Sequence, residues 1–203
     1  MKTGYNPKLK KSELEKKIAR QITTDEVIES GITGQILSLS SIDYIIEKKI
    51  VKRNPNFKFT CCEFDPDTYY AMLKTVAEKK LPFFDNRMCA LSEIIYSSVK
   101  NNYAHIIADY CRTFNSHAEE LEHILRNDIL KIGGTLAITL SKSRFQFVKS
   151  EHYKRMCKIK KQVKGTNKTE HALNVMTAQY PNYEVIVRHN YKAMILFIIR
   201  RVK

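Results

Sequence analysis

The sequence predicts an α/β fold built on a mostly parallel sheet, with antiparallel strands at the C-terminal end. Two observations lead to this prediction. Short apolar runs typical of buried strands alternate along the chain with segments whose apolar residues recur at helical spacing. The chain then ends in two strand-like runs, Glu184–His189 and Ala193–Ile199, and the short connection between them is typical of a β-hairpin.

The first 34 residues are predicted to form a basic helical extension ahead of this α/β domain, which we assign to residues 35–203. Leu14, Ile18 and Ile22 recur every four residues, which predicts a helix over Ser12–Ile28. Residues 1–20 contain seven lysines and arginines and two acids, a net charge of +5. Such a helix either packs on the domain with its lysines in water or forms a basic arm over a cleft.

The α/β domain begins with a predicted βαβ unit. Gln35–Ser40 is a short apolar run of the buried-strand type, and Ser40 and Ser41 are suitable N-cap residues for the helix that follows. A second strand is predicted over Phe57–Glu63, after a crossover of suitable length. The first turn would present helix N-terminal amides to a ligand. It holds no glycine, which disfavours a close-packed phosphate loop.

The alternation of helices and strands continues as far as the hairpin. We expect four further helices, over Asp67–Lys79, over Ser92–Lys100, after a capping box formed by Ser116 and Glu119, and over His171–Gln179. We expect three further strands, at Phe83-Phe84, over Tyr103–Ala108, and over Thr135–Leu140 after a turn at Gly133-Gly134.

Length and composition indicate one globular domain of ordinary size. The 203 residues are 43% hydrophobic, and no apolar run approaches the length of a membrane span, so we expect no membrane association. The basic N-terminus lacks the apolar segment of a signal peptide. Five cysteines, an odd number without the spacing of a metal site, are typical of reduced thiols in a cytoplasmic protein, and we expect no metal.

The net charge of +14 favours a polyanionic partner, nucleic acid above all. The alternative is that lysine simply keeps the surface soluble, but the charge is concentrated. Residues 149–168 hold eight lysines and arginines and one acid, a net charge of +7. We interpret 149–170 as a basic insertion in the α/β domain. Its candidate nucleic-acid-binding residues are Lys154, Arg155, Lys158, Lys160, Lys161 and Lys164.

Two acidic residues stand at the ends of predicted strands. Glu63 stands at the end of the strand before the Asp67–Lys79 helix, where an acid can accept hydrogen bonds from both hydroxyls of a ribose. The same stretch is also explained simply as a strand end and a helix cap, because Asp65 and Asp67 both suit that role. Asp109 follows the strand Tyr103–Ala108 and is either an acid beside a bound ligand or a turn residue.

Three ring side chains near Asp109 also have two interpretations. Tyr110 and Phe114 either stack on a nucleic-acid base or pack in the core. His105 lies inside an apolar strand, which is more typical of a packed core histidine than of a base or ligand.

Four segments in this order resemble the class I S-adenosylmethionine-dependent methyltransferases over about Gln35–Val202. They match the first cofactor motif, the acidic motif after the second strand, the fourth-strand motif and the turn into the fifth strand: Ile36–Ser41, Cys62–Pro66, Ile106–Asp109 and Leu130–Leu136. The resemblance implies a Rossmann-like methyltransferase sandwich with an antiparallel last strand, and S-adenosylmethionine as cofactor.

The resemblance also implies a set of site residues. Glu63 matches the acid that binds the cofactor ribose, and Asp109 is the candidate catalytic residue. The implied cofactor-binding residues are Leu39, Ser40, Ser41, Glu63, Phe64, Ala90, Leu91 and Asp109. The chain departs from the family twice. Leu39–Ile42 replaces the usual G-x-G turn, and Ala90 stands where an acid near the adenine is often found.

Two functions follow from these features. The first is an S-adenosylmethionine-dependent methyltransferase that acts on RNA or DNA, which the retained Glu63 and Asp109 favour. The alternative is a catalytically inactive protein of the same fold that binds nucleic acid or a protein partner, which the missing glycines favour.

Overall fold

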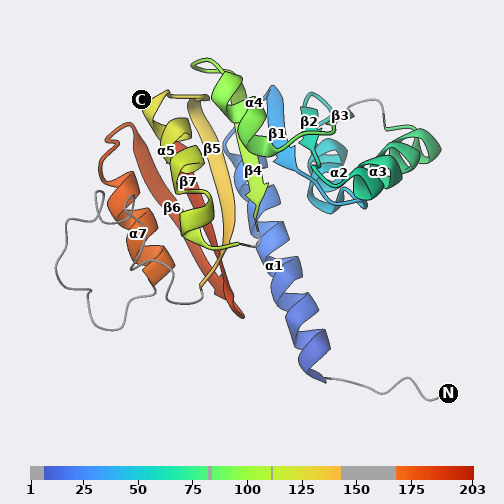
Figure 1. Ribbon diagram of the computed structural model, residues 1–203, viewed down its shortest axis with the longest axis horizontal. Coiled ribbons are helices and arrows are strands. Elements are labelled where there is room, and N and C mark those ends of the chain that lie inside the picture. Colours follow the sequence, from blue (N-terminus) through green and yellow to red (C-terminus); the bar gives the residue numbers. More distant parts are fainter. Residues whose placement is uncertain (1–6, 82–83, 111, 143–167) are drawn as a thin grey trace.

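A computed structural model describes residues 7–81, 84–110, 112–142 and 168–203. Its centre is a seven-stranded sheet in the order β3-β2-β1-β4-β5-β7-β6 (Figure 1). Strands β1 to β5 run parallel, and β7 is antiparallel to both β5 and β6. The predicted α/β fold is therefore confirmed. The strands are β1 (Gln35–Leu39), β2 (Lys58–Cys62), β3 (Phe84–Arg87), β4 (Tyr103–Asp109), β5 (Leu130–Ser141), β6 (Tyr183–Tyr191) and β7 (Met194–Arg201).

Helices cover both faces of this sheet. The helices on one face are α1 (Pro7–Glu29), α2 (Ile45–Arg53) and α3 (Pro66–Lys79), and those on the other are α4 (Leu91–Ser97), α5 (Ala118–Arg126) and α7 (Lys168–Thr177). Along β4, Ile106 packs with α4 and α5, whereas Ile107 packs with α1 and α2. This two-sided burial explains why the central strands are continuous apolar runs without polar alternation.

Helix α1 is one continuous helix that packs across the sheet and extends beyond it at its N-terminal end (Figure 1). Ala19 packs against β5, β6 and β7, and Val27 packs against β1 and β4. Two ion pairs bind the same helix to its neighbours. Asp25 pairs with Arg53 of α2, and a Glu26 carboxylate oxygen lies 3.3 Å from an Arg200 guanidinium nitrogen of β7.

Two predicted helix caps are wrong. Helix α2 begins at Ile45 after Tyr44, whose left-handed backbone (φ 48°) ends the turn, so Ser40 and Ser41 do not cap it. Ser116 belongs to a short 3₁₀ helix, η1 (Phe114–Ser116), and α5 begins two residues later without a side-chain cap. In both places a tight turn separates the polar residue from the helix, which sequence spacing alone does not reveal.

The predicted turn at Gly133-Gly134 is instead an irregularity inside β5. The register between β4 and β5 shifts at this point, between Tyr103 and His105. Gly133 has a φ of 80°, which L residues rarely adopt. A Cβ atom on Gly134 would lie 2.2 Å from the Ala104 carbonyl oxygen. Gly134 therefore permits close approach of β4, and Gly133 supplies the positive φ beside it, without a reversal of the chain.

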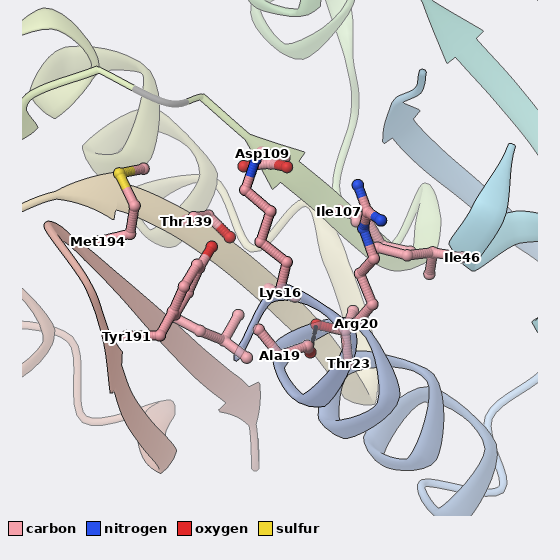
Figure 2. A pocket seen from close by; sticks show the side chains of 12 residues that line it. Lys16, Ala19, Arg20, Thr23, Ile46, Ile107, Asp109, Thr139, Tyr191 and Met194 are labelled. Atoms are coloured by element: carbon pink, nitrogen blue, oxygen red, sulfur yellow. Dashed lines mark hydrogen bonds between the residues drawn. The ribbon is translucent and has the colours of Figure 1, made fainter. Parts of the chain in front are cut away.

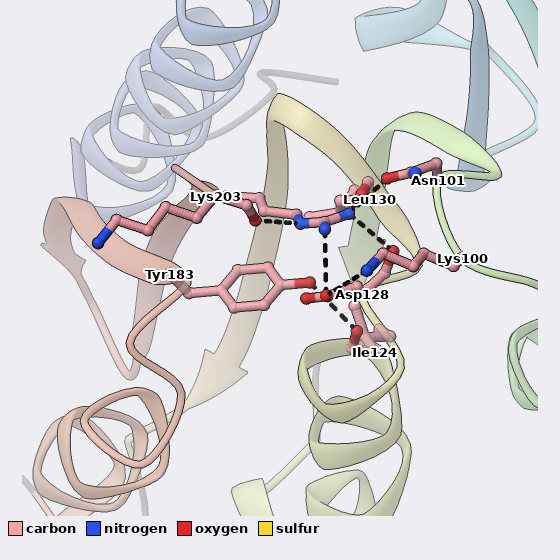
Figure 3. A network of polar contacts seen from close by, with 8 residues as sticks. Lys100, Asn101, Ile124, Asp128, Leu130, Tyr183 and Lys203 are labelled. Carbon is pink, nitrogen blue, oxygen red and sulfur yellow. Dashed lines mark hydrogen bonds and ion pairs between the residues drawn. The ribbon is translucent and has the colours of Figure 1, made fainter.

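A polar network closes the end of the sheet opposite the carboxyl ends of the parallel strands (Figure 3). Arg201 is 2% exposed, and its guanidinium donates to the side-chain oxygen of Asn101 and to the backbone carbonyls of Asp128, Leu130 and Lys203. The same guanidinium lies 3.1 Å from an Asp128 carboxylate oxygen. One cation thus joins the C-terminal strand to the turns before β4 and β5.

His105 is a fully buried histidine of β4, as its apolar context predicts. Its Nε2 lies 2.8 Å from the Ile32 carbonyl oxygen, so this nitrogen carries the proton. Its Nδ1 accepts from the Thr135 backbone N–H at 3.2 Å. Burial, and then the nearby Lys131 charge, outweigh the Ile32 hydrogen bond and lower the pKa of His105 from 6.5 to about 4.

We expect His105 to make the fold acid-sensitive. Because its pKa is lower in the folded chain, protons bind preferentially to the unfolded chain between pH 6.5 and about 4. The stability is therefore complete above pH 6.5 and falls by about 1.4 kcal/mol per pH unit below it. Urea unfolding should show that the wild type loses about 2 kcal/mol more than His105→Gln between pH 7 and pH 5. Equal losses would contradict this assignment.

Candidate cofactor site

The candidate site lies at the carboxyl ends of β1, β2 and β4. The strand order reverses between β1 and β4, and open α/β sheets bind ligands at such a point. A cleft of about 460 Å³ is present here. Five of the predicted cofactor residues line it together, namely Leu39, Ser40, Ser41, Glu63 and Asp109.

Three other predicted cofactor residues do not line this cleft. Phe64 is 74% exposed beyond the end of β2. Leu91 is buried in the core between the sheet and α4. Ala90 is half-buried directly before α4, where its N–H donates to the Glu93 carboxylate at 2.9 Å.

The connection between β1 and α2 is organised around Glu47, which the sequence analysis missed. This carboxylate is 3% exposed, and its Oε1 accepts from the hydroxyls of Ser38 (2.6 Å) and Ser40 (2.7 Å). Ser40 is itself 6% exposed, because its hydroxyl is used inside the turn. One signal was present in the sequence: Glu47 lies three residues before Ile50 and therefore on the buried face of the amphipathic helix.

Asp65, and not Glu63, caps the helix that follows β2. The Asp65 carboxylate caps α3, because its Oδ1 accepts from the Thr68 N–H (2.9 Å) and hydroxyl (2.7 Å). These two hydrogen bonds lower the pKa of Asp65. Glu63 is half-buried at the end of β2, where its Oε1 accepts from the Asp65 N–H at 2.8 Å. That bond holds the Glu63 carboxylate at the strand end, in the wall of the cleft.

Asp109 ends β4 as an exposed residue, but the two aromatic residues after it are core residues. Tyr110 is 7% exposed, donates its hydroxyl to Glu120 and stacks on His117 with the ring centroids 3.6 Å apart. Phe114 is fully buried between the sheet and the helices of that face. The interpretation that these two rings stack on a base is therefore wrong.

The cleft has an acidic lining within a strongly basic protein. Among the described residues, four acids and one cation border it: Asp43, Glu47, Glu63, Asp109 and Arg20. Its remaining wall includes the apolar side chains of Leu39, Ile42, Ile45, Ile46 and Ile107. Such a combination suits a small ligand that carries positive charge, apolar surface and hydroxyl groups.

The predicted nucleic-acid-binding residues Lys154, Arg155, Lys158, Lys160, Lys161 and Lys164 lie outside the described residues. Within the described ranges, no helix is both long enough and apolar enough to cross a membrane.

Solved structures share the arrangement of this chain. Magnesium protoporphyrin IX methyltransferase from Synechocystis, solved with bound S-adenosylhomocysteine (SAH), matches at a TM-score of 0.61 and 7% identity over 99% of this chain and 90% of that one. A provisionally named methylase from Haemophilus influenzae has a TM-score of 0.61, 10% identity and coverage of 91% and 88%. An rRNA methylase from Streptococcus thermophilus has a TM-score of 0.57, 9% identity and coverage of 90% and 95%.

These likenesses show that the chain has the fold of the class I S-adenosylmethionine-dependent methyltransferases. The last strand, β7, is antiparallel to its neighbours, as the sequence resemblance implied, and it lies between β5 and β6. No protein-family model and no curated protein matches the sequence. Since fold alone does not define activity, the function has to be argued from the site.

Proposed function

We propose that the protein is an S-adenosylmethionine-dependent methyltransferase that acts on nucleic acid. The observation that carries this proposal is the acid-lined cleft where the strand order reverses. A sulfonium cofactor is cationic, and a cleft with four acids and one cation favours it electrostatically although the whole chain has a net charge of +14.

The cleft also fits this cofactor in size and chemistry. Its volume of about 460 Å³ lies in the usual range of small-molecule sites, so the serines that replace the glycine turn leave it open. The Glu63 carboxylate would accept hydrogen bonds from the ribose hydroxyls. Asp43 and Glu47 would offset the positive charge of the ligand, and Leu39 and Ile42 would contact its apolar surface.

The cofactor would supply a methyl group on a sulfonium. The residues of the chain would align the methyl acceptor with this group and offset the positive charge of the sulfonium. Asp109 borders the cleft at the tip of β4. We assign its carboxylate as the group that accepts a hydrogen bond from the methyl acceptor. Methyl transfer demands in-line alignment of acceptor and methyl group more than it demands catalytic side chains. A sparse set of catalytic residues is compatible with this reaction.

The nucleic-acid substrate is supported by the concentration of +7 within residues 149–168. We expect binding of a single-stranded RNA to weaken steeply with salt, because each neutralised phosphate releases counterions. Changing Lys158, Lys160 and Lys161 together to glutamine should lower the slope of log K against log salt by about two units or more. An RNA-binding constant that does not change with salt concentration would argue against a nucleic-acid substrate.

The proposed function is tested by calorimetric titration with S-adenosylmethionine and SAH. We expect micromolar dissociation constants for both ligands. Failure of both to bind at millimolar concentration would favour the alternative, a protein of this fold that binds nucleic acid without the cofactor. One observation favours that alternative, namely the side-chain network of Ser38, Ser40 and Glu47 in place of the glycine turn.

A further inference from the structure

A second, smaller cavity adjoins the candidate cofactor cleft. It has a volume of about 150 Å³ and lies between α1 and the strands β4 to β7 (Figure 2). Arg20, Ile46, Ile107 and Asp109 border both the cavity and the cleft. A molecule in the cavity would therefore be separated from a ligand in the cleft by these side chains alone.

Helix α1 supplies two cations to this cavity. Lys16 and Arg20 are one turn apart on the helix, and Figure 2 shows the Lys16 side chain extending from α1 toward Asp109 and the Arg20 side chain extending toward Ile107. Neither cation has an acidic partner among the residues that the structure describes. By contrast, Asp25 and Glu26 of the same helix are engaged in ion pairs with α2 and β7.

This difference separates two segments of α1. The segment from Thr23 onward is attached to the domain by its ion pairs and by burial of Thr23, Thr24 and Val27. The segment that carries Lys16 and Arg20 presents cations at a cavity whose only acid among the described residues is Asp109. The described lining of the cavity therefore has a net charge of +1, opposite in sign to that of the cleft beside it.

We propose that this cavity binds a phosphate group of the methyl acceptor, with Lys16 and Arg20 as its cationic ligands. The assignment rests on the proposed function, because it makes the cavity the acceptor side of the same site. A phosphate offers several oxygens and can accept from two separate cations at once. A cavity of this volume holds about one small ring or one group of comparable size, which is room for a single phosphate group.

The proposal is tested by calorimetric titration with inorganic phosphate, adenosine 5′-monophosphate and the dinucleotide ApA. The variants are Lys16→Gln and the double variant Lys16→Gln/Arg20→Gln. Lys17→Gln is the matched control, because it removes the same charge from an adjacent exposed residue that does not line the cavity. We expect Lys16→Gln to weaken binding of the phosphate probes roughly tenfold, the double variant to weaken it further, and the control to change it less than twofold.

The relative affinities of ApA and adenosine 5′-monophosphate distinguish the two possible sources of the phosphate group. Tighter binding of ApA would indicate the phosphodiester of a nucleic-acid chain, and tighter binding of the monophosphate would indicate a small phosphorylated acceptor. Either order of affinities supports the proposal, provided that binding of the probes depends on Lys16. Equal affinities for Lys16→Gln and Lys17→Gln, or no binding of any probe to the wild type at millimolar concentration, would overturn it.

Parallel titration with SAH separates this proposal from the proposed function. Lys16 borders the cavity and not the cleft, so Lys16→Gln should leave SAH affinity unchanged. If the wild type binds the phosphate probes through Lys16 but does not bind SAH, the methyltransferase proposal fails and the phosphate site stands. If SAH binds and binding of the phosphate probes does not depend on Lys16, the phosphate-site proposal fails and the cofactor part of the proposed function stands.

Discussion

Replacement of Glu63 by alanine is expected to weaken SAH binding about a hundredfold. The substitution removes two charge-assisted hydrogen bonds to the ribose hydroxyls, each with a net worth of about 1.5 kcal/mol at the lower end of the usual range, and together these correspond to about a hundredfold in affinity. Glu63→Gln keeps one acceptor oxygen and should lose about tenfold. The measurement is calorimetric titration with SAH.

The control for this prediction is Asp67→Ala. Asp67 is an exposed acid of the first turn of α3 that does not line the cleft, so its removal should change SAH affinity less than twofold. Circular dichroism would check that each variant is folded, since Glu63 also accepts from the Asp65 N–H. Unchanged affinity in folded Glu63→Ala would show that the ribose assignment is wrong.

Replacement of Arg201 by methionine is expected to lower the free energy of unfolding by about 3–5 kcal/mol. The substitution leaves the Asp128 carboxylate without its most buried partner and removes the donor from the Leu130 carbonyl. Lys100 remains 3.3 Å from Asp128, but its side chain is 62% exposed and offsets little of the loss. Urea unfolding measures the change.

Arg200→Met is the matched control for this second prediction. Arg200 is the neighbouring residue of β7 and pairs with Glu26 of α1 at a site about one-third exposed, so its loss should remove no more than about 1 kcal/mol. If both variants lost the same stability, the network of Figure 3 would not be what stabilises this end of the sheet.

The fold could be predicted because the central strands are buried on both faces. Their apolar runs, such as Tyr103–Asp109, differ clearly from the helical spacing of the segments between them. The helix starts at Ile45 and Ala118 could not be predicted, because tight turns before them displace the expected caps. The two glycines of β5 were misassigned as a turn because the close strand approach at Gly134 depends on a neighbour, Ala104, that is distant in sequence.

The candidate site could be predicted only in part. The acids at strand ends, Glu63 and Asp109, follow from topology, because the carboxyl ends of parallel strands meet at one edge of the sheet. Glu47 was missed because its role depends on two serine hydroxyls that the fold turns toward it. The cavity beside α1 was also missed, because which face of α1 packs on the sheet is set by tertiary contacts of Ala19 and Val27.

The network of Ser38, Ser40 and Glu47 has a consequence for how this turn can evolve. A serine-to-glycine change alone would remove a donor from a buried carboxylate, and loss of Glu47 alone would leave two buried hydroxyls without their acceptor. Each single substitution toward the glycine turn of the family is therefore destabilising. Joint replacement of the two serines and Glu47 avoids this cost, because it leaves neither a buried carboxylate nor a buried hydroxyl without its partner. Among relatives of this chain, the three positions should change as a set, and sequences with a glycine turn should lack the glutamate.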